Sequence, residues 1–234
     1  AFQVKGGQDA DRDVELIARL RELCGADICL RLDANCGYGD AKRGLEAVRR
    51  LADSGADFVE QPAADIESLT RITEQSPIPI LADELCWSPG DALALTARRA
   101  VDGLSVYVAK AAGMGGAMAV TQIAAAAGLP HDLNGSLEAG IGNAASLHVA
   151  VASEAELLAS VLPINGPAGD LPTAMLGRYF TDDVVAAGFE VSEGAVVVGR
   201  DPGLGIEVDD EKLERYAVAR RASNAEALEL EASR

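Results

Sequence analysis

The sequence predicts an α/β protein whose parallel strands form a modified TIM-type (β/α) barrel. Three observations predict this fold class. Short apolar strands alternate with segments that carry apolar residues at helical spacing. The repeat is about 25 residues long, as expected for a strand–helix unit with a right-handed crossover. Finally, five successive strands end on an ionisable residue, with gaps of 28, 27, 23 and 27 residues between these positions.

The expected strands and helices follow one another regularly along the chain. Strands are predicted at residues 2–5, 27–33, 56–62, 78–84, 103–110 and 128–135. Helices are predicted between them at 12–23, 41–55, 65–75, 89–100 and 115–128, several of which end at glycine or proline. Six such units favour a closed barrel, and a doubly wound open sheet is the alternative that this alternation leaves open.

Composition and charge argue against several classes of protein. A formal net charge of −17 over 234 residues is unfavourable for binding nucleic acid or an anionic membrane surface. No apolar run reaches the roughly 20 residues of a membrane span. We expect no signal peptide, and therefore a cytoplasmic protein. The four cysteines form no CxxC pair and the two histidines are distant from them, which argues against zinc.

The ionisable strand ends define a candidate site. They are Lys5, Asp33, Glu60, Asp83 and Lys110. In a barrel the carboxyl ends of the strands form one rim, where barrel active sites lie. Three carboxylates without histidine or cysteine make a ligand set of hard oxygens, which suits Mg²⁺, with Mn²⁺ as a substitute. The sequence therefore predicts a magnesium site on this rim.

The two lysines predict acid–base chemistry on the same rim. Three strands intervene between Lys5 and Lys110, which places the two lysines on opposite sides of an eight-stranded barrel. A lysine that acts as a neutral base needs its pKa lowered by about 2–3 units from about 10.4, and desolvation and a nearby divalent cation both lower it. We expect one lysine to remove the proton α to a carboxylate while the metal stabilises the charge that develops.

Seven segments together resemble the barrel domain of the enolase superfamily (muconate lactonizing enzyme and mandelate racemase type), in its muconate lactonizing enzyme subgroup. The resemblance runs from residue 2 to about residue 216. The segments are Gln3-Val4-Lys5, LDANCGY (32–38), FVEQP (58–62), LADE (81–84), VAKAAGMGG (108–116), NGSLEAGIGNAASLH (134–148) and DPGLGIEVD (201–209). Each alone is weak, and together they are highly specific.

The resemblance implies a role for most of the candidate residues. It implies that Asp33, Glu60 and Asp83 bind magnesium and that Lys5 and Lys110 are the acid–base pair. The neighbours that it implies for orienting these ligands are Asn35, Gln61 and Glu84. We also expect Ser136 and Glu138 near the rim. Glu138 is either a substrate contact or the cap of the following helix.

Two features depart from the pattern of the subgroup. Many members have lysine where this chain has Gln3, which shares a strand face with Lys5 and keeps hydrogen-bonding capacity without the charge. The resemblance makes this glutamine a hint of a proline-type substrate. The sequence also starts within the second strand of the family's barrel, so the first strand and the N-terminal α+β capping domain are missing from it.

We expect residues 1–180 to form the barrel from its second strand onward. Residues 181–234 would form a C-terminal segment that in relatives packs toward the capping domain, here ending in a frayed helix.

The predicted function is magnesium-dependent abstraction of the proton α to a carboxylate, through a metal-stabilised enediolate. Racemisation or epimerisation of an amino-acid or proline-type carboxylate is the leading outcome, because two opposed lysines allow a proton to leave one face and return to the other. A dehydratase acting on hydroxyproline-type substrates and a cycloisomerase are alternatives that use the same intermediate. An alternative of another class is a non-catalytic, metal-binding remnant of a barrel. We expect a small carboxylate as partner, and a homo-oligomer.

The pair His131-Asp132 suggests a second general base, which the strand geometry argues against. Adjacent residues of a strand point to opposite faces, so these two side chains are not expected to form a catalytic dyad. His148 lies in an apolar helical pattern and is expected to be a packed or hydrogen-bonded residue of its helix.

Overall fold

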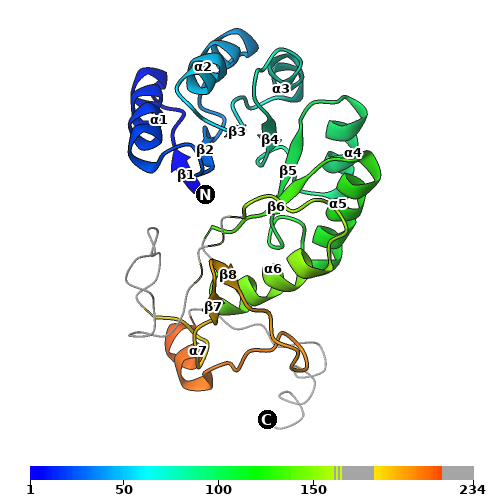
Figure 1. Cartoon of the computed structure of the whole chain (residues 1–234). Coiled ribbons are helices and arrows are strands. Elements are labelled where there is room, and N and C mark those ends of the chain that lie inside the picture. The colour runs from blue at the N-terminus through cyan, green and yellow to red at the C-terminus, as the bar shows by residue number, and fades with distance from the viewer. Residues whose placement is uncertain (137, 161, 163, 165–181, 218–234) are drawn as a thin grey trace.

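A six-stranded parallel sheet forms the centre of the protein, and its strands lie side by side in chain order. The computed structural model describes residues 1–136, 138–160, 162, 164 and 182–217. The sheet curls into a half-barrel whose first and last strands are β1 and β6 (Figure 1), and Leu157 forms an isolated parallel bridge to His131 of β6. Its strands are β1 (Phe2–Lys5), β2 (Leu30–Asp33), β3 (Phe58–Glu60), β4 (Ile80–Ala82), β5 (Gly103–Val106) and β6 (His131–Leu133).

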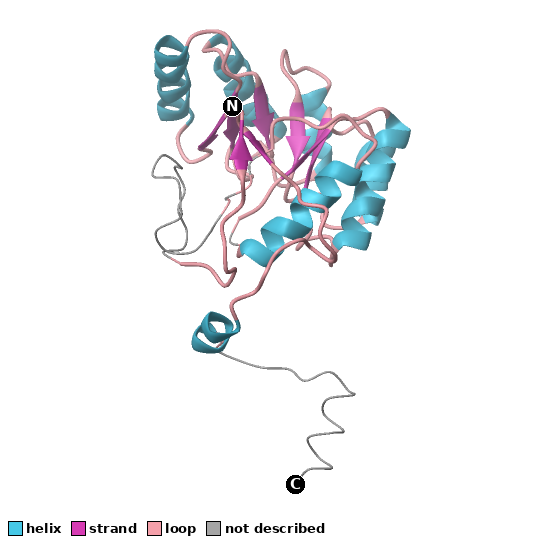
Figure 2. Cartoon of the chain, turned by 60° about the horizontal axis from the view of Figure 1, so that its bottom comes forward, coloured by secondary structure: helices cyan, strands magenta, loops and turns pink. Residues whose placement is uncertain are grey.

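A helix follows each of these strands and covers the outer face of the curled sheet (Figures 1 and 2). The helices are α1 (Ala10–Cys24), α2 (Ala41–Asp53), α3 (Ile66–Thr73), α4 (Pro89–Ala97), α5 (Met114–Ala127) and α6 (Gly140–Ala152). A doubly wound sheet carries helices on both faces. The curled sheet with its helices on one face therefore confirms the prediction of a barrel-type fold.

Side-chain caps start most of these helices where the sequence offers an acidic or hydroxyl residue. Asp9, Asp40, Asp65 and Ser88 each accept a backbone N–H from the first turn of α1, α2, α3 and α4, respectively. The helix α5 ends at Gly128, which adopts the left-handed conformation that glycine allows at this position. These signals fix the helix lengths and hence the spacing of the strand ends.

Apolar residues of the strands pack between the sheet and its helices. Leu30, Val59 and Ile80 of the strands are fully buried, as are Leu51 and Leu69 of the covering helices. The register aligns the carboxyl ends of the strands, because Lys5 lies opposite Asp33 and Asp33 lies opposite Glu60. The core thus holds the residues of the predicted rim at one level.

The described part of the C-terminal region forms a small unit below α6 in Figure 1. It contains the two-stranded antiparallel sheet of β7 (Val191–Ser192) and β8 (Ala195–Val196), and the helix α7 (Asp210–Tyr216). His148 of α6 donates from its Nε2 to the backbone carbonyl of Leu204, 3.1 Å away. The predicted boundary at residues 180 and 181 and the predicted frayed helix end fall outside the described residues. Within the described ranges, no helix has both the length and the apolar character needed to cross a bilayer.

Candidate active site

Three buried carboxylates meet at the carboxyl ends of neighbouring strands. Asp33 ends β2, Glu60 ends β3 and Asp83 directly follows β4. Asp33 and Glu60 are fully buried and Asp83 is 7% exposed. One oxygen from each carboxylate lies within 4.8 Å of the others. The structure thus brings together the three predicted metal ligands, although their separations along the chain are 27 and 23 residues.

The electrostatics of this acidic triad (Asp33, Glu60 and Asp83) favour a bound cation. Burial raises the pKa of Glu60 well above its ordinary value, because Arg31 offsets burial only in part and Asp33 adds repulsion. Burial also raises the pKa of Asp83, against the opposing charge of Lys110. Crowded, desolvated carboxylates are stabilised by a positive charge between them. Their oxygen donors and close spacing fit Mg²⁺ or Mn²⁺.

Lys5 lies beside the triad at the end of β1. Its Nζ forms an ion pair with Oδ2 of Asp33, and 58% of its side chain is exposed. Burial tends to lower the pKa of Lys5, but the charges of Asp33, Glu60 and Asp83 outweigh burial and raise it above its ordinary value. A divalent cation on the triad would compensate these same carboxylates.

Lys110 approaches the triad from its other end, in a more enclosed position. Its Nζ forms an ion pair with Asp83, and only 10% of the Lys110 side chain is exposed. The same atom donates to the backbone carbonyl of Asp83 at 2.8 Å and to that of Ser105 at 3.2 Å. It also lies 4.4 Å from the centre of the Tyr107 ring. The two lysines therefore contact different carboxylates of the triad and differ strongly in solvent exposure.

Gln3 donates hydrogen bonds to two of the three carboxylates. Its amide Nε2 donates to Asp33 at 3.1 Å and to Glu60 at 3.0 Å, and its Oε1 accepts from Arg31 at 3.2 Å. Gln3 and Lys5 both contact the triad, as the spacing of two residues in a strand predicts. An amide can donate and accept at once, which a lysine cannot do.

Asn35 and Glu84 sit next to the triad. The backbone N–H of Asn35 donates to Oδ1 of Asp33 at 2.9 Å, and its side chain donates to Asp33 at 3.2 Å and to Glu84 at 3.0 Å. Asn35 adopts a positive φ of 42°, which asparagine tolerates better than most residues. The turn after β2 therefore aims both donors at the same carboxylate.

Gln61 is fully buried and fixes the segment that carries Asp83. Its Oε1 accepts from the backbone N–H groups of Asp83 at 2.8 Å and Leu85 at 3.3 Å. Its Nε2 donates to the carbonyl of Ala63 at 2.7 Å. Gln61 thus orients a carboxylate of the triad through the backbone.

Ser136 and Glu138 lie on the loop between β6 and α6. The backbone N–H of Ser136 donates to the carboxylate of Glu138 at 2.5 Å. The first N–H of α6, on Gly140, donates instead to Asp183 at 2.8 and 3.0 Å. The expected role of Ser136 and Glu138 in substrate binding stays a prediction.

The structure separates His131 from Asp132, as the alternation of a strand predicts. The Nε2 of His131 lies 2.6 Å from the hydroxyl of Ser153, whereas Asp132 forms an ion pair with Arg31. Burial lowers the pKa of His131. The histidine thus faces the helical side and the aspartate faces the interior of the half-barrel.

Sequence reasoning missed a buried group that supports Lys5. Asp13 of α1 is 5% exposed and accepts from the backbone N–H of Gly7 at 2.7 Å and from the hydroxyl of Tyr38 at 2.8 Å. Gly7 has a φ of +91°, and a Cβ there would lie 1.9 Å from the carbonyl oxygen of Ala34. Asp13 therefore ties the loop after Lys5 to the loop after Asp33. An acidic residue in the first turn of a helix gave no signal of this role.

Sequence reasoning also missed a set of contacts beneath the triad. They are made by Arg31, Asp132 and Asn134. Arg31 contacts Glu60 and Asp132, and Asn134 donates to Glu60 at 3.3 Å. The position of Arg31, two residues before Asp33 in the same strand, was a usable signal, because such residues share a strand face. A charged residue facing a barrel interior needs a partner of opposite charge.

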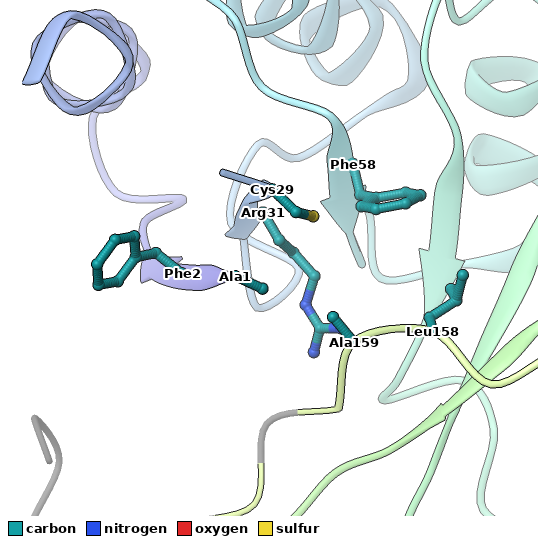
Figure 3. A pocket seen from close by; sticks show the side chains of 7 residues that line it. All are labelled: Ala1, Phe2, Cys29, Arg31, Phe58, Leu158 and Ala159. Carbon is teal, nitrogen blue, oxygen red and sulfur yellow. The ribbon is translucent and has the colours of Figure 1, made fainter. Parts of the chain in front are cut away.

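Two hollows lie along β1, one at its carboxyl end and one at its amino end. A cavity of about 410 Å³ lies beside Lys5 and is lined in part by Arg12, Asn35 and the Gly6-Gly7 loop. A smaller pocket lies among Ala1, Phe2, Cys29, Arg31, Phe58, Leu158 and Ala159. Figure 3 shows Arg31 extending from β2 to the neighbourhood of Ala159 in this pocket. The larger cavity contacts Lys5 and Asn35, which both bind Asp33 of the triad.

The cysteines near the site are protonated at neutral pH. Burial, together with the charges of Glu84 and Asp33, raises the pKa of Cys36 to about 11. Burial raises the pKa of Cys86 to about 11 as well. All four cysteines are free thiols. A protonated thiol is a poor metal ligand and a poor nucleophile, so neither Cys36 nor Cys86 competes with the carboxylates.

The curled sheet and the acidic triad on its carboxyl rim define a (β/α)-barrel protein with a candidate site for a divalent metal. The chain belongs to the family described as Enolase C-terminal domain-like, whose profile matches residues 1–212.

The curated relatives of the chain include several isomerases. It is 28% identical over 217 residues to muconate cycloisomerase 1-1 of Acinetobacter lwoffii, covering 92% of this chain and 54% of that protein. It is 27% identical over 220 residues to the N-succinyl-L-Arg/Lys racemase of Bacillus cereus, covering 93% and 56%. The chain therefore spans about half the length of these relatives.

Solved structures give the same relationship. The dipeptide epimerase of Cytophaga hutchinsonii, complexed with Mg and the dipeptide D-Ala-L-Val, superposes with a TM-score of 0.79 at 29% identity. That match covers 91% of this chain and 55% of the epimerase. The muconate cycloisomerase of Pseudomonas fluorescens gives a TM-score of 0.81 at 27% identity, covering 93% and 58%.

Proposed function

We propose that this chain carries the catalytic rim of a magnesium-dependent enzyme that removes the proton α to a carboxylate. Racemisation or epimerisation of an amino-acid-derived or proline-type carboxylate is the proposed outcome. The observation that carries the proposal is the placement of Lys5 and Lys110 on different carboxylates of one buried triad. Relatives named as a racemase and an epimerase support the choice of reaction.

Asp33, Glu60 and Asp83 would hold the metal. When bound, Mg²⁺ neutralises the negative charge that grows on the substrate carboxylate as the α-proton leaves. Asn35 and Gln61 keep Asp33 and Asp83 oriented through the hydrogen bonds described above. Gln3 does the same for Asp33 and Glu60.

The two lysines divide the proton transfer between them. One accepts the α-proton at its Nζ, and the other donates a proton from its Nζ to the opposite face of the same carbon. Lys110 is held by Asp83 and two backbone carbonyls, so its position is fixed. Lys5 is more exposed and lines a cavity of about 410 Å³. Which lysine serves as the base then depends on the enantiomer bound.

A cycloisomerase is the second candidate, because several relatives are named muconate cycloisomerase. The same residues would serve a cycloisomerase. One lysine would then donate a proton to a carbon of the substrate, and no α-proton would be removed first. The loss of a β-substituent, as in a dehydratase, is a third outcome of the same proton abstraction. These three outcomes differ in their products and not in the residues required.

Proton exchange with solvent tests the proposal directly. The chain is incubated with Mg²⁺ in D₂O and with both enantiomers of proline derivatives, N-acylated amino acids and dipeptides, and loss of the α-proton signal is followed by NMR. We expect exchange with at least one class, and no exchange after addition of a chelator. New vinyl signals in the same samples identify elimination, and lactone signals in a parallel sample with muconate identify cycloisomerisation.

Lysine variants make the test specific. Lys5→Ala and Lys110→Ala are each expected to abolish exchange of one enantiomer, whereas Lys42→Ala, on an exposed lysine of α2, leaves exchange unchanged. Exchange of both enantiomers in both variants contradicts the two-base arrangement. Magnesium binding without exchange of any substrate favours a metal-binding barrel without catalysis.

A further inference from the structure

A buried ion pair spans the interior of the half-barrel beneath the triad. Arg31 of β2 is 4% exposed and Asp132 of β6 is fully buried. Their ion pair joins residues that are 101 positions apart and lie on strands with three others between them in the sheet. Charged residues are rarely buried in this way, since desolvation of two charges is unfavourable unless the pairing is good.

The guanidinium of Arg31 is shared between two carboxylates. One terminal nitrogen, Nη1, contacts Asp132, and the other, Nη2, lies 3.1 Å from Oε2 of Glu60. A guanidinium is planar and rigid, so anchoring one side of it also fixes the direction of the other. Asp132 therefore influences Glu60 through Arg31.

Glu60 is further held by contacts from separate parts of the sheet. Its Oε2 accepts from Gln3 of β1 at 3.0 Å, and its Oε1 accepts from Asn134, just after β6, at 3.3 Å. Asn134 in turn donates to the hydroxyl of Ser105 of β5 at 2.8 Å. Of these partners, only Arg31 brings a positive charge to Glu60, and Asp132 balances that charge.

We propose that Arg31 and Asp132 form a positioning pair that orients Glu60 as a metal ligand, with Asp132 acting through Arg31. The proposal rests on the proposed function, in which Glu60 binds the metal. Groups that hold a metal ligand in place commonly change metal affinity when they are removed. A pair that served stability alone would leave metal affinity unchanged once the fold is intact.

A charge-neutral double variant separates these two roles. Arg31→Met/Asp132→Leu removes one positive and one negative charge together, so the net charge around the triad does not change. We expect the dissociation constant for Mn²⁺, measured by electron paramagnetic resonance, to rise by about 10- to 100-fold. Arg31→Lys keeps the charge and loses the rigid fork, and it is expected to raise the constant by about three- to tenfold. Thermal unfolding of each variant is measured alongside.

Arg21→Met is the matched control for lost stability. Arg21 donates to the carbonyl of Gly55 and to the carboxylate of Asp57, and none of its recorded contacts involves the triad. We expect this variant to lower the unfolding temperature and to leave Mn²⁺ affinity unchanged. The contrast shows whether a loss of stability alone weakens metal binding.

The proposal is overturned if the double variant folds and binds Mn²⁺ within about twofold of the wild type. If the double variant does not fold, Arg31→Lys decides, and affinity within about twofold overturns the proposal. Wild-type chain that binds no Mn²⁺ overturns this inference and the proposed metal site together. Weakened Mn²⁺ binding in the variants, with no proton exchange in the wild type, supports the positioning pair and contradicts the proposed catalysis.

Discussion

Lys5 and Asp33 are direct register partners in the parallel pairing of β1 with β2, and their side chains form an ion pair. The candidate base therefore contacts an oxygen, Oδ2, of a candidate metal ligand. A metal on the triad would compete with Lys5 for that oxygen. Metal binding and the freedom of the Lys5 ammonium are consequently coupled.

This coupling predicts opposite effects of Lys5 on metal binding and on exchange. We expect Lys5→Met to bind Mn²⁺ as tightly as the wild type or several-fold more tightly, because the competing cation is gone. Exchange of one substrate enantiomer is expected to be lost. Mn²⁺ titration and NMR exchange on the same preparation measure both quantities. Weaker Mn²⁺ binding in this variant would contradict the competition.

Removal of a ligand predicts a larger change in metal affinity. Glu60→Gln and Asp83→Asn are each expected to weaken Mn²⁺ binding by more than about 100-fold, a larger effect than that of groups that only orient ligands. The matched control is Glu67→Gln, whose carboxylate forms an exposed ion pair with Arg98 and does not belong to the triad. It should change the affinity by less than about threefold. Equal losses in all three variants would mean that the triad does not bind the metal specifically.

The buried carboxylate of Asp13 predicts a stability effect. Asp13→Ala leaves the Gly7 N–H and the Tyr38 hydroxyl without their acceptor, so the free energy of unfolding should fall by about 2–4 kcal/mol. Tyr38→Phe removes one of the two bonds and should lower it by about 1 kcal/mol. Tyr216→Phe is the control, because the hydroxyl of Tyr216 bonds Asp182 at an exposed position. Urea unfolding of the three variants measures these differences.

His131 predicts a pH dependence of stability. Burial lowers its pKa in the folded chain below the unfolded value of about 6.5, so the unfolded chain binds a proton that the folded chain does not. The contribution of neutral His131 to the free energy of unfolding is therefore complete above about pH 6.5. It is lost as the pH decreases toward the folded pKa, by up to about 1.4 kcal/mol per pH unit. Urea unfolding at pH 7.5, 6.5 and 5.5 should show a smaller decrease for His131→Gln than for the wild type. Equal decreases would mean that His131 does not carry the effect.

The sequence predicted the parts of the fold that depend on spacing. The regular distance between strand ends predicted that Asp33, Glu60 and Asp83 lie on one rim. This distance is regular because local signals start and end the helices, such as the N-cap Asp40 and the C-cap Gly128. The alternation of strand residues likewise separated His131 from Asp132. Such features follow from short-range geometry and need no knowledge of distant contacts.

Long-range pairing could not be predicted in the same way. Arg31 and Asp132 meet only because the sheet curls, and a flat sheet of the same strand order would hold β2 and β6 apart. The link from Asp13 to Gly7 and Tyr38 depends on a close approach of two loops, which no spacing encodes.

The backbone of β1 pairs with β2 alone in the part of the sheet that the structure describes. Local opening of an edge strand needs far less free energy than global unfolding. Such opening would withdraw Lys5 and Gln3 from the rim while β2 to β4 keep the three carboxylates together. Hydrogen exchange at β1 would therefore report the position of the proposed proton-transfer group separately from the integrity of the acidic triad.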